Sequence, residues 1–255
     1  MPLEIVTVAC RTDNYAFVLH DAASGQTALV DAPDVPAISA VLDARGWRLN
    51  DILITHHHDD HITGVEELRA IYGARVIGAA ADAHRLPTLD LSVAEGDVLR
   101  VCDADMLVID VSGHTLGHVA FYFAASAAAF TADSLMAMGC GRLFEGTPAQ
   151  MWDSLLKLRA LPDETLICSG HEYTANNARF AATLEPENPA LRDRIAAISA
   201  DRAAGRFTVP SLLGLEKRTN PFLRADDPAL AAAIGMSDAT ALQVFTEIRR
   251  MKDKF

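Results

Sequence analysis

The stretch Ile52–Gly64, ILITHHHDDHITG, decides how the rest of the chain is interpreted. Four of the chain's nine histidines and two aspartates fill positions 56–61, directly after a run of aliphatic and β-branched residues. Folding alone gives no reason for such a cluster, because adjacent imidazoles repel one another when protonated and pack poorly when neutral. The cluster indicates a chemical site at the end of a strand, where loops from separate segments can converge.

The composition indicates a folded protein with a sizeable core. Half of the 255 residues are hydrophobic, and no apolar run approaches the roughly 18 to 20 residues of a membrane span. The first residues form neither a signal peptide nor an Arg-rich presequence, so we expect a cytoplasmic protein. Cys10, Cys102, Cys140 and Cys168 lack paired spacing, which favours free thiols over a disulfide framework.

The net charge limits the possible partners. With 22 basic and 34 acidic residues, the chain carries a formal charge of −12. Nucleic acids and anionic membranes need a basic surface, so neither is expected as a partner. An anionic substrate would need a positive site built locally against this charge.

Strand and helix patterns alternate along the first two thirds of the chain. Three strand patterns at 3–9, 15–20 and 27–31 follow one another without a helix, which predicts an antiparallel start. A helix is predicted from Asp34, its cap, to Gly46, its stop. Further helices are predicted around 65–72 and after the capping-box sequence that begins at Thr147. Further strands are predicted at 51–55, 74–78, 98–101, 106–111, 119–123, 129–133 and 165–169.

The pattern changes after Tyr173. Helical patterns broken by proline and glycine fill residues 174–255, with little strand character. We therefore predict a catalytic domain at residues 1–173 and a second, smaller helical domain at 174–255.

Four predicted strands each lead to residue types that bind metals. These residues are His56, His58, Asp60, His61, His114, His118, Asp133 and His171. Imidazole suits zinc, iron or manganese, and a carboxylate can bridge two cations. Adjacent Asp60 and His61 point apart unless the chain turns, an arrangement that suits two neighbouring metals better than one. A weak, adventitious metal patch would not explain ligands at three further strand ends.

The remaining histidines of the chain have simpler interpretations. On an extended segment, His57 and Asp59 would face away from the metals and need other roles. His20 and His84 are interpreted as ordinary structural residues.

The sequence THHHDDH matches T-H-x-H-x-D-H, the signature of the metallo-β-lactamase superfamily, and the chain resembles this superfamily. Within it, the chain is similar to the glyoxalase II, or hydroxyacylglutathione hydrolase, family. The segments that carry this resemblance are SGHTLGH, FTADSLMAMGCGRLFEGTP, SGHEYTANNARF, TNPFLR and RRMKDKF. They follow the expected order over nearly the whole chain.

The resemblance implies an α+β fold, a four-layer αββα sandwich followed by a small all-helical C-terminal domain that helps to bind glutathione. It implies two divalent transition metals per chain, with zinc expected first and iron or manganese as alternatives. One metal would be held by His56, His58 and His114. The second would be held by Asp60, His61 and His171, and Asp133 would bridge the two. His118 would not be a ligand.

The implied reaction is hydrolysis of S-D-lactoylglutathione to glutathione and D-lactate, the second step of methylglyoxal detoxification. Two metals lower the pKa of a water between them, so that a metal-bound hydroxide can attack the thioester carbonyl. Asp60 and Asp133 are the catalytic residues expected to hold this arrangement. The thiolate leaves readily, and the chain contains no GxSxG nucleophile motif.

The glutathione contacts implied by the resemblance are Arg142, Phe144, Tyr173, Arg249 and Lys252. Arg249 and Lys252 are three apart on a predicted helix, so they share a face on which they can grip one carboxylate. Some relatives carry a tyrosine where this chain has Phe144, so any hydroxyl contact from that position is absent.

Two other functions share some of these features. A glutathione persulfide dioxygenase with a single iron has the same histidine motif but generally lacks the helical tail with RxxKD. A non-catalytic binding protein would be expected to have lost ligands, whereas all seven are present. The chain is expected to act as a monomer on a small molecule.

Overall fold

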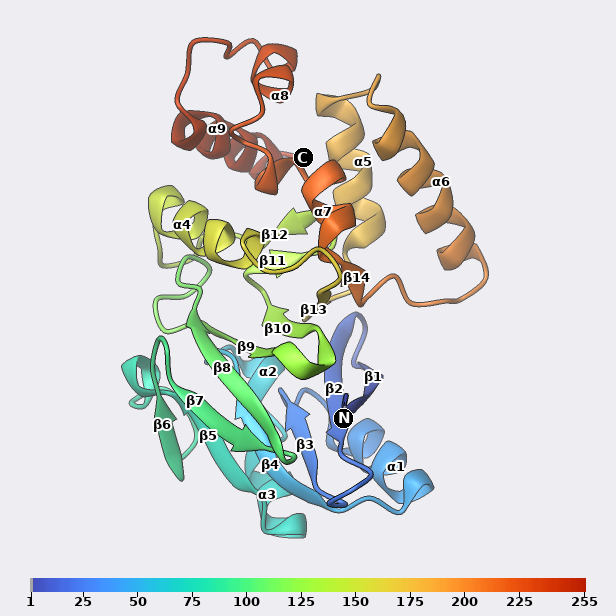
Figure 1. Ribbon diagram of the computed structural model, residues 1–255, viewed down its shortest axis with the longest axis vertical. Helices are drawn as coiled ribbons and strands as arrows, with labels where there is room; N and C mark the ends of the chain where they lie inside the picture. Colours follow the sequence, from blue (N-terminus) through green and yellow to red (C-terminus); the bar gives the residue numbers. More distant parts are fainter. Residues whose placement is uncertain (1) are drawn as a thin grey trace.

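Two six-stranded β-sheets face each other in the computed structural model, which describes residues 2–255 (Figure 1). The first sheet contains, in order, β1 (Glu4–Cys10), β2 (Asn14–His20), β3 (Thr27–Val30), β4 (Leu49–Ile54), β5 (Arg75–Ala79) and β6 (Leu91–Val93). The second has the order β14 (Ser211–Leu212), β13 (Leu166–Ser169), β10 (Ala128–Ala132), β9 (Val119–Phe123), β8 (Ala104–Asp110) and β7 (Val98–Val101). A separate hairpin consists of β11 (Leu135–Met136) and β12 (Gly139–Cys140).

The predicted antiparallel start and the first predicted helix are both confirmed. β1 pairs with β2, and β2 with β3, in antiparallel fashion, whereas β3, β4 and β5 run parallel. Helix α1 (Val35–Arg45) begins where the Asp34 carboxylate accepts a hydrogen bond from Ala37 N at 3.0 Å. It ends at Gly46, whose φ of 65° is a left-handed conformation that glycine adopts without strain.

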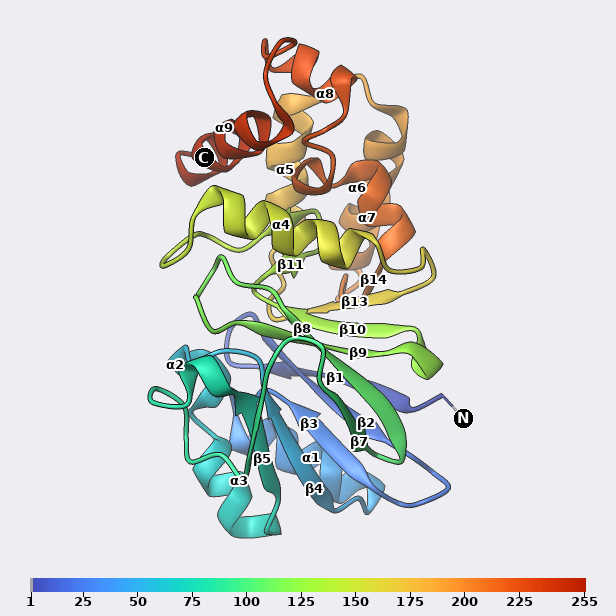
Figure 2. The same cartoon turned by 60° about the vertical axis from the view of Figure 1, so that its left-hand side comes forward.

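Helices cover both outer faces of the sheet pair, so the molecule has four layers (Figure 2). Helix α1 and α3 (Val65–Tyr72) lie against the first sheet, and α4 (Pro148–Arg159) lies against the second. Helix α4 starts with the predicted capping box, in which Thr147 and Gln150 exchange hydrogen bonds. The predicted αββα layering is therefore confirmed.

A helical segment follows the second sheet and packs beside α4 (Figure 1). Its helices are α5 (Thr174–Leu184), α6 (Pro189–Ala203), α7 (Leu213–Thr219), α8 (Pro228–Ala233) and α9 (Ala241–Asp253). Short 3₁₀ turns are η1 (Ala80–Asp82), η2 (Ala124–Ser126) and η3 (Pro221–Leu223). No helix among residues 2–255 is both long enough and apolar enough to cross a membrane.

One strand in the helical segment was not predicted. β14 pairs antiparallel with β13 and so covers an edge of the second sheet that would otherwise expose unpaired backbone groups. Because this strand joins the helical segment to the second sheet, the division of the chain at residue 173 stays a prediction.

Three apolar clusters hold the layers together. Between the sheets, the Phe17 and Phe130 rings pack edge to face with centroids 5.5 Å apart. Ile38 and Leu42 attach α1 to the first sheet, and Phe245 is among the residues that join α9 to α4 and the second sheet. Complete burial of such a side chain contributes roughly 1.5 to 3 kcal/mol. The site described next lies on a well-packed scaffold.

Candidate metal centre

The predicted metal ligands converge although they come from four separate parts of the chain. Strands β4, β8, β10 and β13 end just before them, as expected, and the one-turn helix α2 (Asp59–Ile62) carries two of them. Their nitrogen and oxygen atoms form three overlapping groups, each within 4.8 Å, that could hold metal ions. The groups are His56, His58 and His114; His56, His61 and Asp133; and Asp60, His61 and His171.

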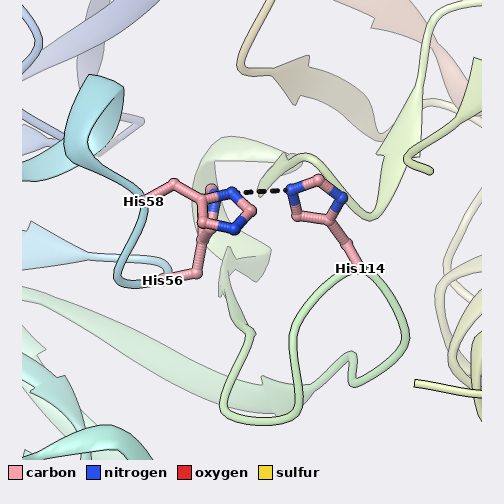
Figure 3. Close-up of side chains that lie close together, drawn as sticks. All are labelled: His56, His58 and His114. Carbon is pink, nitrogen blue, oxygen red and sulfur yellow. Dashed lines mark hydrogen bonds between the residues drawn. The ribbon is translucent and has the colours of Figure 1, made fainter. Parts of the chain in front are cut away.

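The first group consists of three imidazoles (Figure 3). His56 Nε2 lies 3.2 Å from His58 Nδ1, and His114 Nε2 lies 3.0 Å from the same atom. Burial, followed by repulsion from His61 and His118, lowers the pKa of His56 well below its ordinary value. Neutral imidazole nitrogens that meet at one point are the donor set that a transition metal prefers.

In the group of Asp60, His61 and His171, residues adjacent in sequence converge because the chain turns in α2. Asp60 Oδ2 lies 3.7 Å from His61 Nε2 and 3.4 Å from His171 Nε2. Asn14 donates to Asp60 Oδ2 at 2.9 Å and thereby fixes the carboxylate.

Asp133 lies between the group that contains His114 and the group that contains His171. Its Oδ2 is 3.4 Å from His114 Nε2 and 3.3 Å from His171 Nε2, while its Oδ1 is 3.6 Å from His61 Nε2. Burial favours the neutral carboxyl, but His171 and His61 outweigh it and lower the pKa of Asp133 well below its usual range. A buried carboxylate with an oxygen directed toward each group has the position of a bridging ligand.

Further hydrogen bonds orient the imidazoles through their other ring nitrogens. His61 Nδ1 lies 2.8 Å from Asp31 Oδ2, and His171 Nδ1 lies 3.1 Å from Asp13 Oδ1. Two more contacts join His114 Nδ1 to the Arg142 carbonyl at 2.7 Å and His56 Nδ1 to Thr55 Oγ1 at 3.0 Å. Such partners fix the ring and its tautomer, so that the remaining nitrogen can bind a metal.

Sequence reasoning missed these supporting residues, although one of them carried a usable signal. Asp31 is the last residue of a predicted strand, as Asp133 is, and an acid at a strand end is the same signal that pointed to Asp133. Asp13 lies in the turn between β1 and β2, Asn14 begins β2, and neither carries a comparable pattern.

The other histidines near the cluster lie outside the ligand groups. His57 turns away and contacts Asp82, with Nδ1 3.1 Å from Oδ2. His118 is buried against His56, and burial lowers its pKa to about 3. Its Nε2 accepts a hydrogen bond from the backbone N–H of Asp133 at 3.3 Å, so it supports that residue from behind.

A cavity of about 440 Å³ opens onto the metal-site residues. All five predicted glutathione contacts line it, together with five of the candidate ligands. The exposed ring of Phe144 packs edge-on against His58 and His114, with centroids 5.6 and 5.2 Å apart. Tyr173 stacks on His171 at 4.6 Å.

Arg249 is more constrained than the sequence suggested. Only 6% of it is exposed, and it donates to Cys140 O at 3.0 Å and to Asp253 Oδ1 at 2.8 Å. Its Nε also donates to Asp253 Oδ1 at 3.1 Å, and Nη1 lies 3.8 Å from Cys140 Sγ, so these four contacts leave one of the five guanidinium N–H groups. Lys252 is half-buried on the same helix, without an acidic partner in the described chain.

Two family descriptions divide the chain between them. "Metallo-beta-lactamase superfamily" matches residues 13–171, and "Hydroxyacylglutathione hydrolase C-terminus" matches residues 172–255.

Curated relatives match over their full length. A "Hydroxyacylglutathione hydrolase" from Cereibacter sphaeroides is 64% identical over 255 residues, which is all of both chains. One of the same name from Ruegeria pomeroyi is 61% identical, also over all of both chains.

Among solved structures, the chain is similar to ETHE1 from Myxococcus xanthus, with 25% identity and a TM-score of 0.69 over 98% of this chain and 90% of that one. It is also similar to TTHA1623 in a di-iron-bound form, with 25% identity and a TM-score of 0.61 over 86% of this chain and 100% of that one.

Proposed function

Because the chain belongs to the hydroxyacylglutathione hydrolase family of the metallo-β-lactamase superfamily, we propose that it hydrolyses S-D-lactoylglutathione and related 2-hydroxyacyl glutathione thioesters at a two-metal centre. The products are glutathione and the free hydroxy acid. The observation that carries this proposal is the convergence of two ligand groups on one shared carboxylate, Asp133, at the end of a cavity with basic residues.

The residues fit a pair of cations. Within residues 2–255, the buried atoms His61 Nε2 and Asp133 Oδ1 have no hydrogen-bond partner, which is costly unless something else satisfies them. His56, His58 and His114 are proposed to hold one ion, while Asp60, His61 and His171 hold the other and Asp133 bridges both. Imidazole and carboxylate together suit zinc, iron or manganese, and we take zinc as the first expectation.

When bound, such metals polarise a carbonyl and make water a nucleophile near neutral pH. The protein's own part is to hold the site in shape. Asn14 keeps Asp60 directed into the centre, the Tyr173 ring stacks on the His171 imidazole, and the Phe144 ring packs edge-on against His114. Neither aspartate is assigned a separate role as a general base.

The basic side chains along the cavity are proposed to bind the glutathione part, which is a net anion. Arg142 and Lys252 make only long polar contacts, so their charges can attract a substrate carboxylate. Arg142 Nε lies 3.6 Å from Asp253 Oδ1, and Lys252 Nζ lies 3.5 Å from Asn176 O. Arg249, already bonded to Asp253 and Cys140, is proposed to contribute through its one remaining N–H group.

The affinity for substrate is expected to fall as pH rises through about 8, because Lys252 loses its charge there. Burial, with repulsion from Arg249 on its own helix and Arg179 on α5, lowers the pKa of Lys252 to about 8. Below that pH the ammonium attracts a substrate carboxylate, and above it the amine does not. A charge-assisted contact contributes roughly 1.5 kcal/mol or more, so KM should rise about ten-fold between roughly pH 7 and pH 9.

Three variants check this pH dependence. Lys252→Met should give the high KM at every pH, and Lys252→Arg should keep the low KM across the range. Lys254→Met, an exposed lysine two residues further along, is the matched control and should follow the wild type. A KM for Lys252→Met that matches wild type at pH 7 would remove this lysine from the binding site.

The proposed function is tested by a thioester hydrolysis assay on S-D-lactoylglutathione with metal analysis of the same sample. We expect turnover and about two transition-metal ions per chain, a number that follows from the two ligand groups. Oxygen uptake with glutathione persulfide, together with a single iron after reconstitution, would favour the persulfide dioxygenase instead.

The proposed setting is the cytoplasm, where the enzyme acts as a monomer without nucleic acid or membrane. Two observations support this setting. In the part of the chain that the structure describes, the four cysteines are buried free thiols, and the formal net charge is −12. Light scattering coupled to size exclusion gives the oligomeric state.

A further inference from the structure

The hairpin of β11 and β12 lies between two parts of the proposed metal site. Its first arm begins two residues after Asp133, and its second arm leads to Arg142, whose carbonyl lies 2.7 Å from His114 Nδ1. The base of the hairpin is closely packed, because a Cβ at Gly141 would lie 1.8 Å from Asp133 O. A shift of the hairpin would therefore move both the proposed bridging ligand and the support of His114.

Polar side chains from the helical segment hold this hairpin. Asn220 Nδ2 donates to Met136 O at 3.1 Å and to Gly139 O at 3.0 Å, one carbonyl on each arm. At the tip, Glu216 Oε2 accepts from Met138 N at 2.8 Å. Two further bonds run from Asn177 Nδ2 to Ala137 O at 3.1 Å and from Arg249 to Cys140 O at 3.0 Å.

The two residues that bind the hairpin from α7 and its end are themselves hydrogen-bonded and buried away from water. Glu216 and Asn220 are fully buried, and Asn220 Nδ2 also donates to Glu216 Oε2 at 3.1 Å. The other oxygen of Glu216 accepts from Ser211 Oγ at 2.6 Å and pairs with Arg194. Each oxygen of this carboxylate therefore has two polar partners.

Apolar packing also holds the tip of the hairpin in place. The Met138 side chain is fully buried among Ala178 and Ala181 of α5 and Leu191 and Ile198 of α6. Its φ of 62° is uncommon for a residue with a side chain and persists only where the surroundings hold it. In Figure 1 the hairpin lies beside α5 and α7, away from the first sheet.

We propose that Asn220 and Glu216 are positioning residues for the hydrolytic reaction: through the Leu135–Cys140 hairpin they set the positions of Asp133 and of the carbonyl that orients His114. This role rests on the proposed function, and it gives the helical segment a part in the chemistry besides binding glutathione. Neither residue touches the substrate cavity.

The test uses Asn220→Asp in the metal-loaded enzyme. The substitution keeps the size of the side chain but turns an acceptor oxygen toward Met136 O, Gly139 O and Glu216 Oε2. We expect kcat to fall by about ten-fold, as for other residues that orient ligands. KM should change much less than kcat. The cobalt-substituted variant should also show a visible absorption spectrum different from that of the wild type.

A second variant loosens the hairpin without adding charge, in case Asn220→Asp fails to fold. Met138→Ala removes the apolar contact of the tip and should change kcat and the cobalt spectrum in the same direction. Leu42→Ala is the control for stability alone: Leu42 is buried on α1, in an apolar cluster that contains no residue of the hairpin. It should lower Tm and leave kcat and the spectrum unchanged. Asn188→Asp is the matched control for the change from amide to carboxylate. Asn188 caps α6, where aspartate also caps well, so this variant should behave as the wild type.

Two outcomes overturn the proposal. In the first, Asn220→Asp and Met138→Ala lower Tm as Leu42→Ala does but keep the wild-type kcat and cobalt spectrum. In the second, KM rises while kcat is unchanged, which would make the hairpin part of substrate binding only. If the wild type does not hydrolyse S-D-lactoylglutathione, the proposed function fails, and the cobalt spectra still decide whether these residues position the ligands.

Discussion

Asp133→Ala is expected to abolish most of the hydrolytic activity, with kcat reduced on the order of a thousand-fold. Among residues 2–255, Asp133 is the one carboxylate that lies close to both candidate ligand groups, with Oδ2 at 3.4 Å from His114 Nε2 and 3.3 Å from His171 Nε2. Metal ions contribute several kcal/mol of transition-state stabilisation in such sites, and each 1.36 kcal/mol corresponds to a factor of ten. Losing the shared ligand should also lower the metal content below two ions per chain.

The measurement combines steady-state kinetics with metal analysis of the same preparation. Asp105→Ala is a suitable control, because Asp105 is an exposed aspartate that pairs only with Arg100. Asp133→Asn separates charge from size, and we expect it to lose nearly as much activity, since an amide is a poor bridging ligand. Normal turnover with full metal content in Asp133→Ala would show that the bridge has been assigned to the wrong residue.

The convergence of the candidate ligands could be predicted from the sequence, because it depends on residue type and on place along a strand. Strand DILIT was predicted from its aliphatic pattern, and His56 and His58 follow it on an extended segment. Their nitrogens do meet, 3.2 Å apart. The four layers followed from the resemblance, and the antiparallel start followed from three strand patterns without a helix between them.

Local sequence patterns could not predict that the side chains of Asp60 and His61 converge. Whether neighbours in sequence point together depends on a turn, here α2, which has only four residues and no hydrophobic periodicity to reveal it. The burial and hydrogen bonds of Arg249 could not be predicted from the sequence for a similar reason. Spacing placed it on a face with Lys252, but its burial and its bond to Cys140 O come from a contact across 109 positions.

The contacts of Asn220 and Glu216 with the hairpin are the clearest example of contacts between distant residues that the sequence does not predict. Nothing near residue 220 in the sequence indicates that its amide will donate to carbonyls more than 80 positions earlier. A buried amide satisfies whichever carbonyls the fold brings to it, so its partners become visible only in three dimensions.

Asp31→Asn is expected to weaken metal binding by about ten- to a hundred-fold, which is the range for residues that orient metal-binding histidines. Asp31 is buried, and its carboxylate accepts from Thr55 N at 2.9 Å and from Thr55 Oγ1 at 2.8 Å, with His61 Nδ1 also at 2.8 Å. An asparagine amide would turn an N–H toward at least one of these donors. His61 would then lose its tautomer or its orientation.

The substitution isolates this effect because the backbone should tolerate it. Asp31 has a φ of 58°, and asparagine adopts this left-handed conformation as readily as aspartate does. Asp51→Asn is the matched control: Asp51 is also buried in the first sheet, but it pairs with Arg75 and lies away from the ligands. Competition with a chelator of known affinity gives the metal dissociation constants. Wild-type affinity in Asp31→Asn would mean that Asp133 and the packing around His61 orient this imidazole without help from Asp31.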